Sequence, residues 1–82
     1  MTLKIDHSLD ITSEVCPMTF VRTRLLIEKM GAGETAEIRL KGNEPLENVP
    51  ASVTELGHDV LAIEPDSEDN KTGVHRMLIR KN

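Results

Sequence analysis

Apolar residues recur along this chain with two periods, which together predict six secondary-structure elements. Apolar and polar residues alternate over residues 3–6, and Leu9 and Ile11 follow, which predicts an early strand. Residues 17–30 follow a helical period, because uncharged residues recur at i, i+3, i+7 and i+10, namely Phe20, Thr23, Ile27 and Met30, with Leu26 beside them. Gly31 and Gly33 then stand where a helix would end.

The second half of the chain continues this order. Residues 36–41 alternate and predict a half-buried strand, residues 42–45 predict a turn, and apolar residues at helical spacing over residues 46–56 predict a helix that ends at Gly57. Pro50 interrupts that spacing, since proline lacks an N–H and disfavours a helical conformation at Val49. We therefore expect the regular helix to begin at Pro50, after a looser turn over residues 46–49.

Two further strands are predicted at residues 60–63 and 74–81, on either side of a polar loop at residues 66–73. The pattern leaves open which face of the last strand is buried: Val74, Arg76 and Leu78, or His75, Met77 and Ile79.

The order β-α-β-α-β-β predicts an α/β (α+β) fold in a single domain, residues 1–82. Four strands and two short helices can build only two layers. We therefore expect a two-layer α/β sandwich, in which both helices cover one face of a four-stranded mixed sheet. The chain has no Trp or Tyr and a single Phe, so the core must consist of Leu, Ile, Val and Met.

Composition disfavours several classes of function. A net charge of −4 and the near absence of aromatic residues argue against a nucleic-acid partner. No apolar stretch approaches the ~20 residues that span a bilayer, and the first residues lack the apolar run of a secretory signal. A single cysteine cannot form an internal disulfide and suits a reducing compartment. We expect a cytoplasmic protein that contacts neither membrane nor nucleic acid.

That single cysteine, Cys16, stands where the first helix is predicted to begin. Pro17 follows it, and proline is favoured at the first helical position. As the N-cap residue, Cys16 would direct its sulfur at the free N–H groups and the positive end of the helix dipole, which stabilise a thiolate. The usual N-cap residues do not include cysteine. We interpret Cys16 as a reactive thiol; the alternative is a small buried apolar residue.

A second apolar stripe follows the thiol on the same helix, at i, i+3 and i+7, and consists of Met18, Val21 and Leu25. This stripe is either an exposed docking surface for a partner or a half-buried flank at the edge of the sheet. Arg22 either steers an anionic sulfur donor or an acidic partner, or lies on a solvated face. Arg24 is expected to pair with Glu28 at i, i+4.

Metal binding is not expected. His7, His58 and His75 are dispersed, and no pair has the spacing of metal ligands. The acidic residues near Glu44 and in the loop at residues 66–73 match no cation-binding loop.

Several segments together resemble the TusA/SirA-like family of small sulfur carriers. They are the Cys16-Pro17 step that opens a helix, Gly31-Ala32-Gly33-Glu34, Val49-Pro50 before the second helix, Gly57-His58-Asp59 after it, and the ending Leu78-Ile79-Arg80-Lys81. The resemblance extends from about Leu9 to Lys81, and the order of elements fits the family's two-layer sandwich. This chain departs from the family motif Cys-Pro-x-Pro, because Thr19 replaces the second proline, and Ser13-Glu14-Val15 replace the usual Gly-Leu-x.

The resemblance implies a sulfurtransferase-type carrier that holds sulfane sulfur as a persulfide on Cys16. It would take sulfur from a cysteine desulfurase or a rhodanese-like donor and pass it to an acceptor protein, in tRNA thiolation or another sulfur pathway. No dedicated cofactor is expected. Thr19 restores a backbone N–H, which we expect to point toward Cys16 and to shape its loop.

From the residues alone, two other functions remain open. One is a thiol redox or regulatory module, in which Cys16 forms a sulfenic acid or a mixed disulfide. The other is a non-catalytic protein-interaction module, in which Cys16 is incidental.

Overall fold

A computed structural model describes residues 5–15, 18–65 and 73–82 of the chain. The predicted order β-α-β-α-β-β is confirmed by the observed elements: β1 (His7–Asp10), α1 (Met18–Lys29), β2 (Thr35–Lys41), α2 (Asn43–Glu55), β3 (Asp59–Pro65) and β4 (Val74–Arg80).

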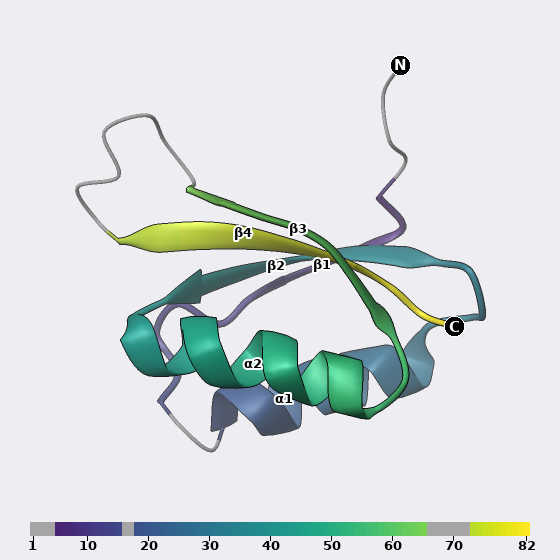
Figure 1. Ribbon diagram of the computed structural model, residues 1–82, viewed down its shortest axis with the longest axis horizontal. Helices are drawn as coiled ribbons and strands as arrows, with labels where there is room; N and C mark the ends of the chain where they lie inside the picture. Colours follow the sequence, from purple (N-terminus) through teal and green to yellow (C-terminus); the bar gives the residue numbers. More distant parts are fainter. Residues whose placement is uncertain (1–4, 16–17, 66–72) are drawn as a thin grey trace.

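The four strands form one mixed sheet in the order β1-β2-β4-β3. β1 pairs with β2 in parallel, whereas β4 is antiparallel to both β2 and β3. Parallel neighbours need a crossover connection, which α1 supplies between β1 and β2. Both helices lie side by side on one face of the sheet (Figure 1). The predicted two-layer sandwich is therefore confirmed.

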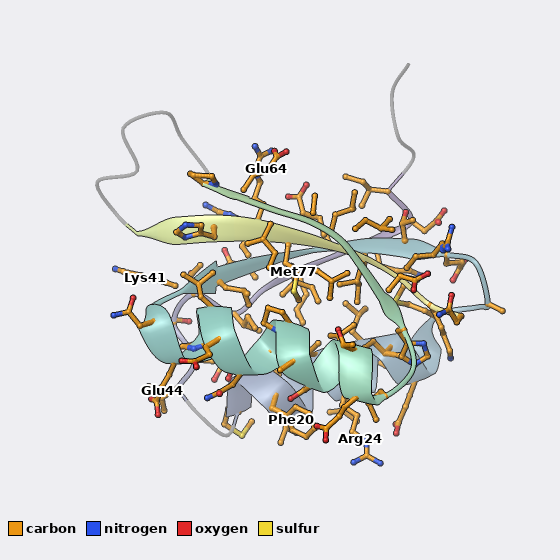
Figure 2. All side chains as sticks on the ribbon, viewed as in Figure 1. Phe20, Arg24, Lys41, Glu44, Glu64 and Met77 are labelled. Atoms are coloured by element: carbon orange, nitrogen blue, oxygen red, sulfur yellow. The ribbon has the colours of Figure 1, made fainter. Side chains whose placement is uncertain are left out.

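The core lies between this sheet and the two helices. Its buried apolar residues are Ile11, Ile27, Met30, Ala36, Ile38, Leu40, Val49, Val53, Met77 and Ile79. Met77 and Ile79 are fully buried, and Met77 points into the space between sheet and helices (Figure 2). Their cross-strand partners on β2 are Ile38 and Ala36, which belong to the same core. The buried face of β4 is thus the one with His75, Met77 and Ile79, joined by Val74 at the strand's start.

The buried face of α1 differs from the prediction at its first turn. Thr23, Ile27 and Met30 are buried as expected, but Phe20 is half-buried and Thr19 is only 2% exposed. At 100° per residue, the buried residues Thr19, Thr23 and Ile27 span an arc of about 80°, and Phe20 lies about 20° beyond the Ile27 edge of that arc. Packing in the fold, and not the period itself, decides which of the two is covered.

The expected late start of the second helix is wrong. α2 runs from Asn43 to Glu55 with Pro50 inside it, and Gly42 enters the helix with a φ of 100°. A proline inside a helix costs about 3 kcal/mol. Val49 and Val53 are 0% and 1% exposed. Because burying one valine contributes about 1.5–3 kcal/mol, burial of this pair offsets the cost of Pro50.

The predicted end of α2 at Gly57 is confirmed. Gly57 has a φ of 91°, a left-handed conformation that glycine adopts without a Cβ clash. Its amide donates to the Thr54 carbonyl at 3.0 Å, and the His58 amide donates to the Val53 carbonyl at 3.1 Å. These two bonds satisfy carbonyls at the helix end that would otherwise lack partners.

Candidate functional site

Cys16 and Pro17, the centre of the predicted site, lie outside the described residues. Their predicted roles as reactive thiol and helix start therefore stay predictions. The described part of the site consists of the residues that neighbour them. The Met18 amide donates to the Val15 carbonyl at 2.7 Å, which joins the described segments on either side of Cys16. Chain connectivity keeps the Cα atom of Cys16 within ~7 Å of that of Met18. Val15 and Met18 are thus the described residues that lie nearest to Cys16 and Pro17 along the chain.

The chain leaves β1 through a turn that Asp10 holds. The Asp10 carboxylate accepts hydrogen bonds from the Thr12 hydroxyl at 2.6 Å, the Thr12 amide at 2.9 Å and the Arg39 guanidinium at 3.0 Å. The two bonds from Thr12, followed by the charge of Arg39, hold the pKa of Asp10 below its ordinary value. Next, Ile11 is buried and its amide donates to the Arg39 carbonyl at 3.1 Å. The segment that leads to Cys16 is therefore anchored on β2.

Arg22 forms an ion pair with a residue on the other side of the thiol. Its Nη1 atom lies 2.9 Å from the Oε1 atom of Glu14. Both side chains are partly exposed, so the pair contributes about 0–1 kcal/mol. Glu14 also offsets the charge through which Arg22 is expected to attract an anion. Sequence reasoning missed this pair, because a separation of eight residues across a helix start is not a helix-face spacing.

The predicted Arg24–Glu28 pair is present, with Nε and Oε1 3.7 Å apart. Both side chains are more than half exposed, so this pair lies on a solvated part of α1.

The apolar stripe that follows the thiol is exposed. Met18, Val21 and Leu25 are 42%, 38% and 50% exposed. Val15, which lies outside the helical spacing of this stripe, is 73% exposed and adjoins Met18 through the hydrogen bond between their backbones. We call these four side chains the α1 patch. They make up half of the exposed large apolar side chains in the described part of the chain. The only sequence signal for Val15 was its position next to Cys16.

Thr19, which replaces the second motif proline, lies in the first turn of α1. Its side chain is buried, and its carbonyl accepts a hydrogen bond from the Thr23 hydroxyl at 2.8 Å. That bond satisfies the buried Thr23 hydroxyl. The expected direction of the Thr19 N–H toward Cys16 stays a prediction.

Residues 5–15, 18–65 and 73–82 contain no group of three or more His, Cys, Asp or Glu side chains that could hold a metal ion. Among the helices that the structure describes, neither has the length and apolar character needed to cross a membrane.

Comparison with known proteins places the chain in a family. The family described as "Sulfurtransferase TusA" matches residues 7–81. A protein of Archaeoglobus fulgidus named "Putative sulfur carrier protein" is 38% identical over 66 residues, which cover 80% of this chain and 75% of that protein. A protein of Thermotoga maritima with the same name is 36% identical over 61 residues, which cover 74% of this chain and 77% of that protein.

The fold has a solved counterpart. The crystal structure of a SirA-like protein from Desulfitobacterium hafniense superimposes with a TM-score of 0.75 at 17% sequence identity, and the match covers 90% of this chain and 95% of that one. The two structures therefore share the fold of a four-stranded sheet with two helices. The chain belongs to the TusA/SirA-like family of sulfur carriers.

Proposed function

We propose that this protein carries sulfane sulfur as a persulfide on Cys16 and relays it from a donor protein to an acceptor protein. In the loading step, the Cys16 thiolate attacks the terminal sulfur of the donor's persulfide. A new bond forms between that sulfur and the Sγ atom of Cys16, while the donor's S–S bond breaks and its cysteine leaves as a thiolate. The electron pair leaves with the donor, so the step has no net oxidation or reduction. Unloading repeats this exchange with the acceptor's thiolate.

The exposed α1 patch is the observation that carries this proposal. A carrier must present its sulfur to two proteins in turn, so it needs an open surface around the thiol more than an enclosed pocket. Val15 and Met18 flank Cys16 in the chain, and Val21 and Leu25 extend the apolar surface along α1. Exposed apolar surface of this kind marks protein contacts. The patch therefore offers donor and acceptor a common docking surface within reach of Cys16.

The charge distribution at the start of α1 also supports a thiolate. The first turn carries no acidic residue, so the positive end of the helix dipole is not neutralised from within the helix. Glu14, the nearest described acid before Cys16 in the chain, is paired with Arg22. We expect the pKa of the Cys16 thiol to lie below that of a free cysteine, because positive potential at a helix start favours the charged form.

We further propose that the donor is a cysteine desulfurase or a rhodanese-like protein and that the relay operates in the cytoplasm. Its product enters tRNA thiolation or another sulfur pathway. The family membership and the patch support a relay between proteins. To identify the pathway, sulfur transfer is measured with purified donors and acceptors, supplied one at a time.

Intact-protein mass spectrometry tests the persulfide directly. The reduced protein is incubated with polysulfide, beside a Cys16→Ala control. We expect the mass of one sulfur atom to be gained, to be reversed by a thiol reductant and to be absent from the control. No gain in the wild-type protein contradicts the carrier function. A sulfenic acid or mixed disulfide without any persulfide would identify a redox module instead.

A further inference from the structure

The two helices carry opposite charges. α1 has three basic residues and one acidic residue, a net charge of +2, whereas α2 has three acidic residues and no basic residue, a net charge of −3. The charged residues of α1 are Arg22, Arg24, Glu28 and Lys29, and those of α2 are Glu44, Glu47 and Glu55. All seven are exposed. α1 is basic although the overall charge of the chain is −4; β4, with Arg76 and Arg80 and no acidic residue, has the same net charge but lies in the sheet and not in the helix layer.

This opposition divides one surface of the molecule into two halves. α1 and α2 lie side by side in the same layer (Figure 1). Arg24 projects from α1, and Glu44 lies at the start of α2 (Figure 2). The helix layer therefore has a basic half, which contains the apolar α1 patch, and an acidic half, which begins at the neighbouring helix. Glu14, the ion-pair partner of Arg22, lowers the net charge of the basic half from +2 to +1.

We propose that the α1 patch docks on a partner protein whose apolar groove is bordered by carboxylates. The apolar side chains of the patch fill the groove and Lys29 meets the acidic border. Arg24 meets it too, by exchanging its exposed pair with Glu28, 3.7 Å away, for a carboxylate of the partner. Carboxylates opposite α2 would be repelled, so the charges also fix the orientation in which the partner binds. The role of this contact in sulfur relay rests on the proposed function, but the binding itself does not require the Cys16 thiol.

A protein fits this surface better than a membrane or a nucleic acid does. A basic amphipathic helix also binds anionic lipid, and basic patches bind phosphates. Those surfaces are anionic throughout, so they would repel the acidic α2 beside α1 and the chain's net charge of −4. A protein can place its carboxylates opposite α1 alone. The attraction between these carboxylates and the basic residues of α1 extends over about one Debye length, about 8–10 Å in physiological salt.

Two synthetic amphipathic helices serve as probes. One consists of leucine and glutamate with its leucines on one face, and the other has lysine in place of every glutamate. Each is titrated into the ¹⁵N-labelled protein, and amide shift changes are mapped along the chain. We expect the leucine–glutamate peptide to perturb α1 and its patch, and the leucine–lysine peptide to perturb α2 instead. Added salt should weaken both, because exposed charges are screened.

Variants identify the contacts. Leu25→Asp and Arg24→Glu should each weaken binding of the leucine–glutamate peptide by about fivefold or more, the effect of removing a central interface residue. Leu61→Asp is the matched control, since Leu61 is 42% exposed on the edge strand β3 and should leave binding unchanged. The titration is repeated with Cys16→Ala, which should bind like the wild type.

Three outcomes overturn the proposal. They are no shift changes on α1 with the leucine–glutamate peptide, equal perturbation of α1 by both peptides, and tighter binding of α1 to phosphatidylserine vesicles than to the peptide. None of them depends on sulfur loading. The docking proposal can therefore fail while the polysulfide experiment succeeds, and the reverse.

Discussion

The substitution Leu25→Asp separates a docking surface from a core residue. Leu25 is 50% exposed on α1, whereas Ile27, two residues later, is 3% exposed and packs in the core. Ile27→Asp is therefore a matched control, because it places the same carboxylate on the same helix but on the buried face.

The expected cost of Leu25→Asp is small. Full burial of a leucine contributes about 1.5–3 kcal/mol, so a half-exposed one loses about 1 kcal/mol. The lower helix propensity of aspartate adds about 0.5 kcal/mol. The new carboxylate lies four residues before Lys29 and three before Glu28, so attraction and repulsion of about 0.2–0.5 kcal/mol each nearly cancel. We expect the free energy of unfolding to fall by about 1–1.5 kcal/mol. Ile27→Asp should lose more than about 4 kcal/mol, because it buries an unpaired charge and empties a core position.

Two assays are read together. Urea unfolding is followed by far-ultraviolet circular dichroism, since a chain without Trp or Tyr offers little intrinsic fluorescence. Persulfide loading is then measured by mass spectrometry with two donors, namely polysulfide, which needs no docking, and a cysteine desulfurase supplied with cysteine. Leu25→Asp should load normally from polysulfide and about fivefold or more slowly from the protein donor.

Two results would refute this reasoning. A loss of stability above about 3 kcal/mol would make Leu25 a core residue, in the range of large-to-small core substitutions. A stable variant that loads from the desulfurase at the wild-type rate would show that the patch is not where this donor docks.

Three further predictions concern the fold. Gly57→Ala should lower the free energy of unfolding by about 1–2 kcal/mol, because φ is positive there, whereas Gly31→Ala, without a positive φ, should cost less in the same urea titration. Pro50→Ala should raise stability by about 1–2 kcal/mol, since it restores a helical N–H donor at the expense of a less constrained unfolded chain; an unchanged urea midpoint would contradict this. The pKa of Asp10 is held below its ordinary value of 3.8 mainly by hydrogen bonds from Thr12, and that of Asp59 mainly by a hydrogen bond from Arg80. Both carboxylates therefore stabilise the fold above about pH 4, and this stabilisation is lost as the pH falls through their folded pKa values. The stability difference between wild type and Asp59→Asn should accordingly shrink between pH 5 and pH 2, and a constant difference would contradict the assignment.

Local pattern anticipated the site only where its residues share one helix. The helical spacing of Met18, Val21 and Leu25 identified the stripe, and the i, i+4 spacing identified the Arg24–Glu28 pair. The sequence did not predict the Glu14–Arg22 pair or the contact of Asp10 with Arg39, because each joins different segments of the chain. Such contacts depend on how elements pack, which no local period encodes.

The burial of apolar side chains in the core also outweighed one local preference, the tendency of proline to interrupt a helix. Pro50 disfavours helix at Val49, yet α2 runs through both residues, since the burial of Val49 and Val53 outweighs a single missing hydrogen bond. The same competition left the buried face of β4 undecided in sequence, where both faces carry apolar residues. Pairing of β4 with β2 brought Met77 beside Ile38 and settled it.

The sequence by itself determined the order of elements, the two-layer class, the helix end at Gly57 and the position of the single cysteine before a helix. These follow from hydrophobic period, glycine geometry and chain connectivity, which act over a few residues. Only the tertiary structure decided that the α1 patch is exposed, that Val15 joins it, and that a basic α1 lies beside an acidic α2. The exposure of a side chain and the charges beside it are properties of the packed layers, because they depend on which elements each face contacts.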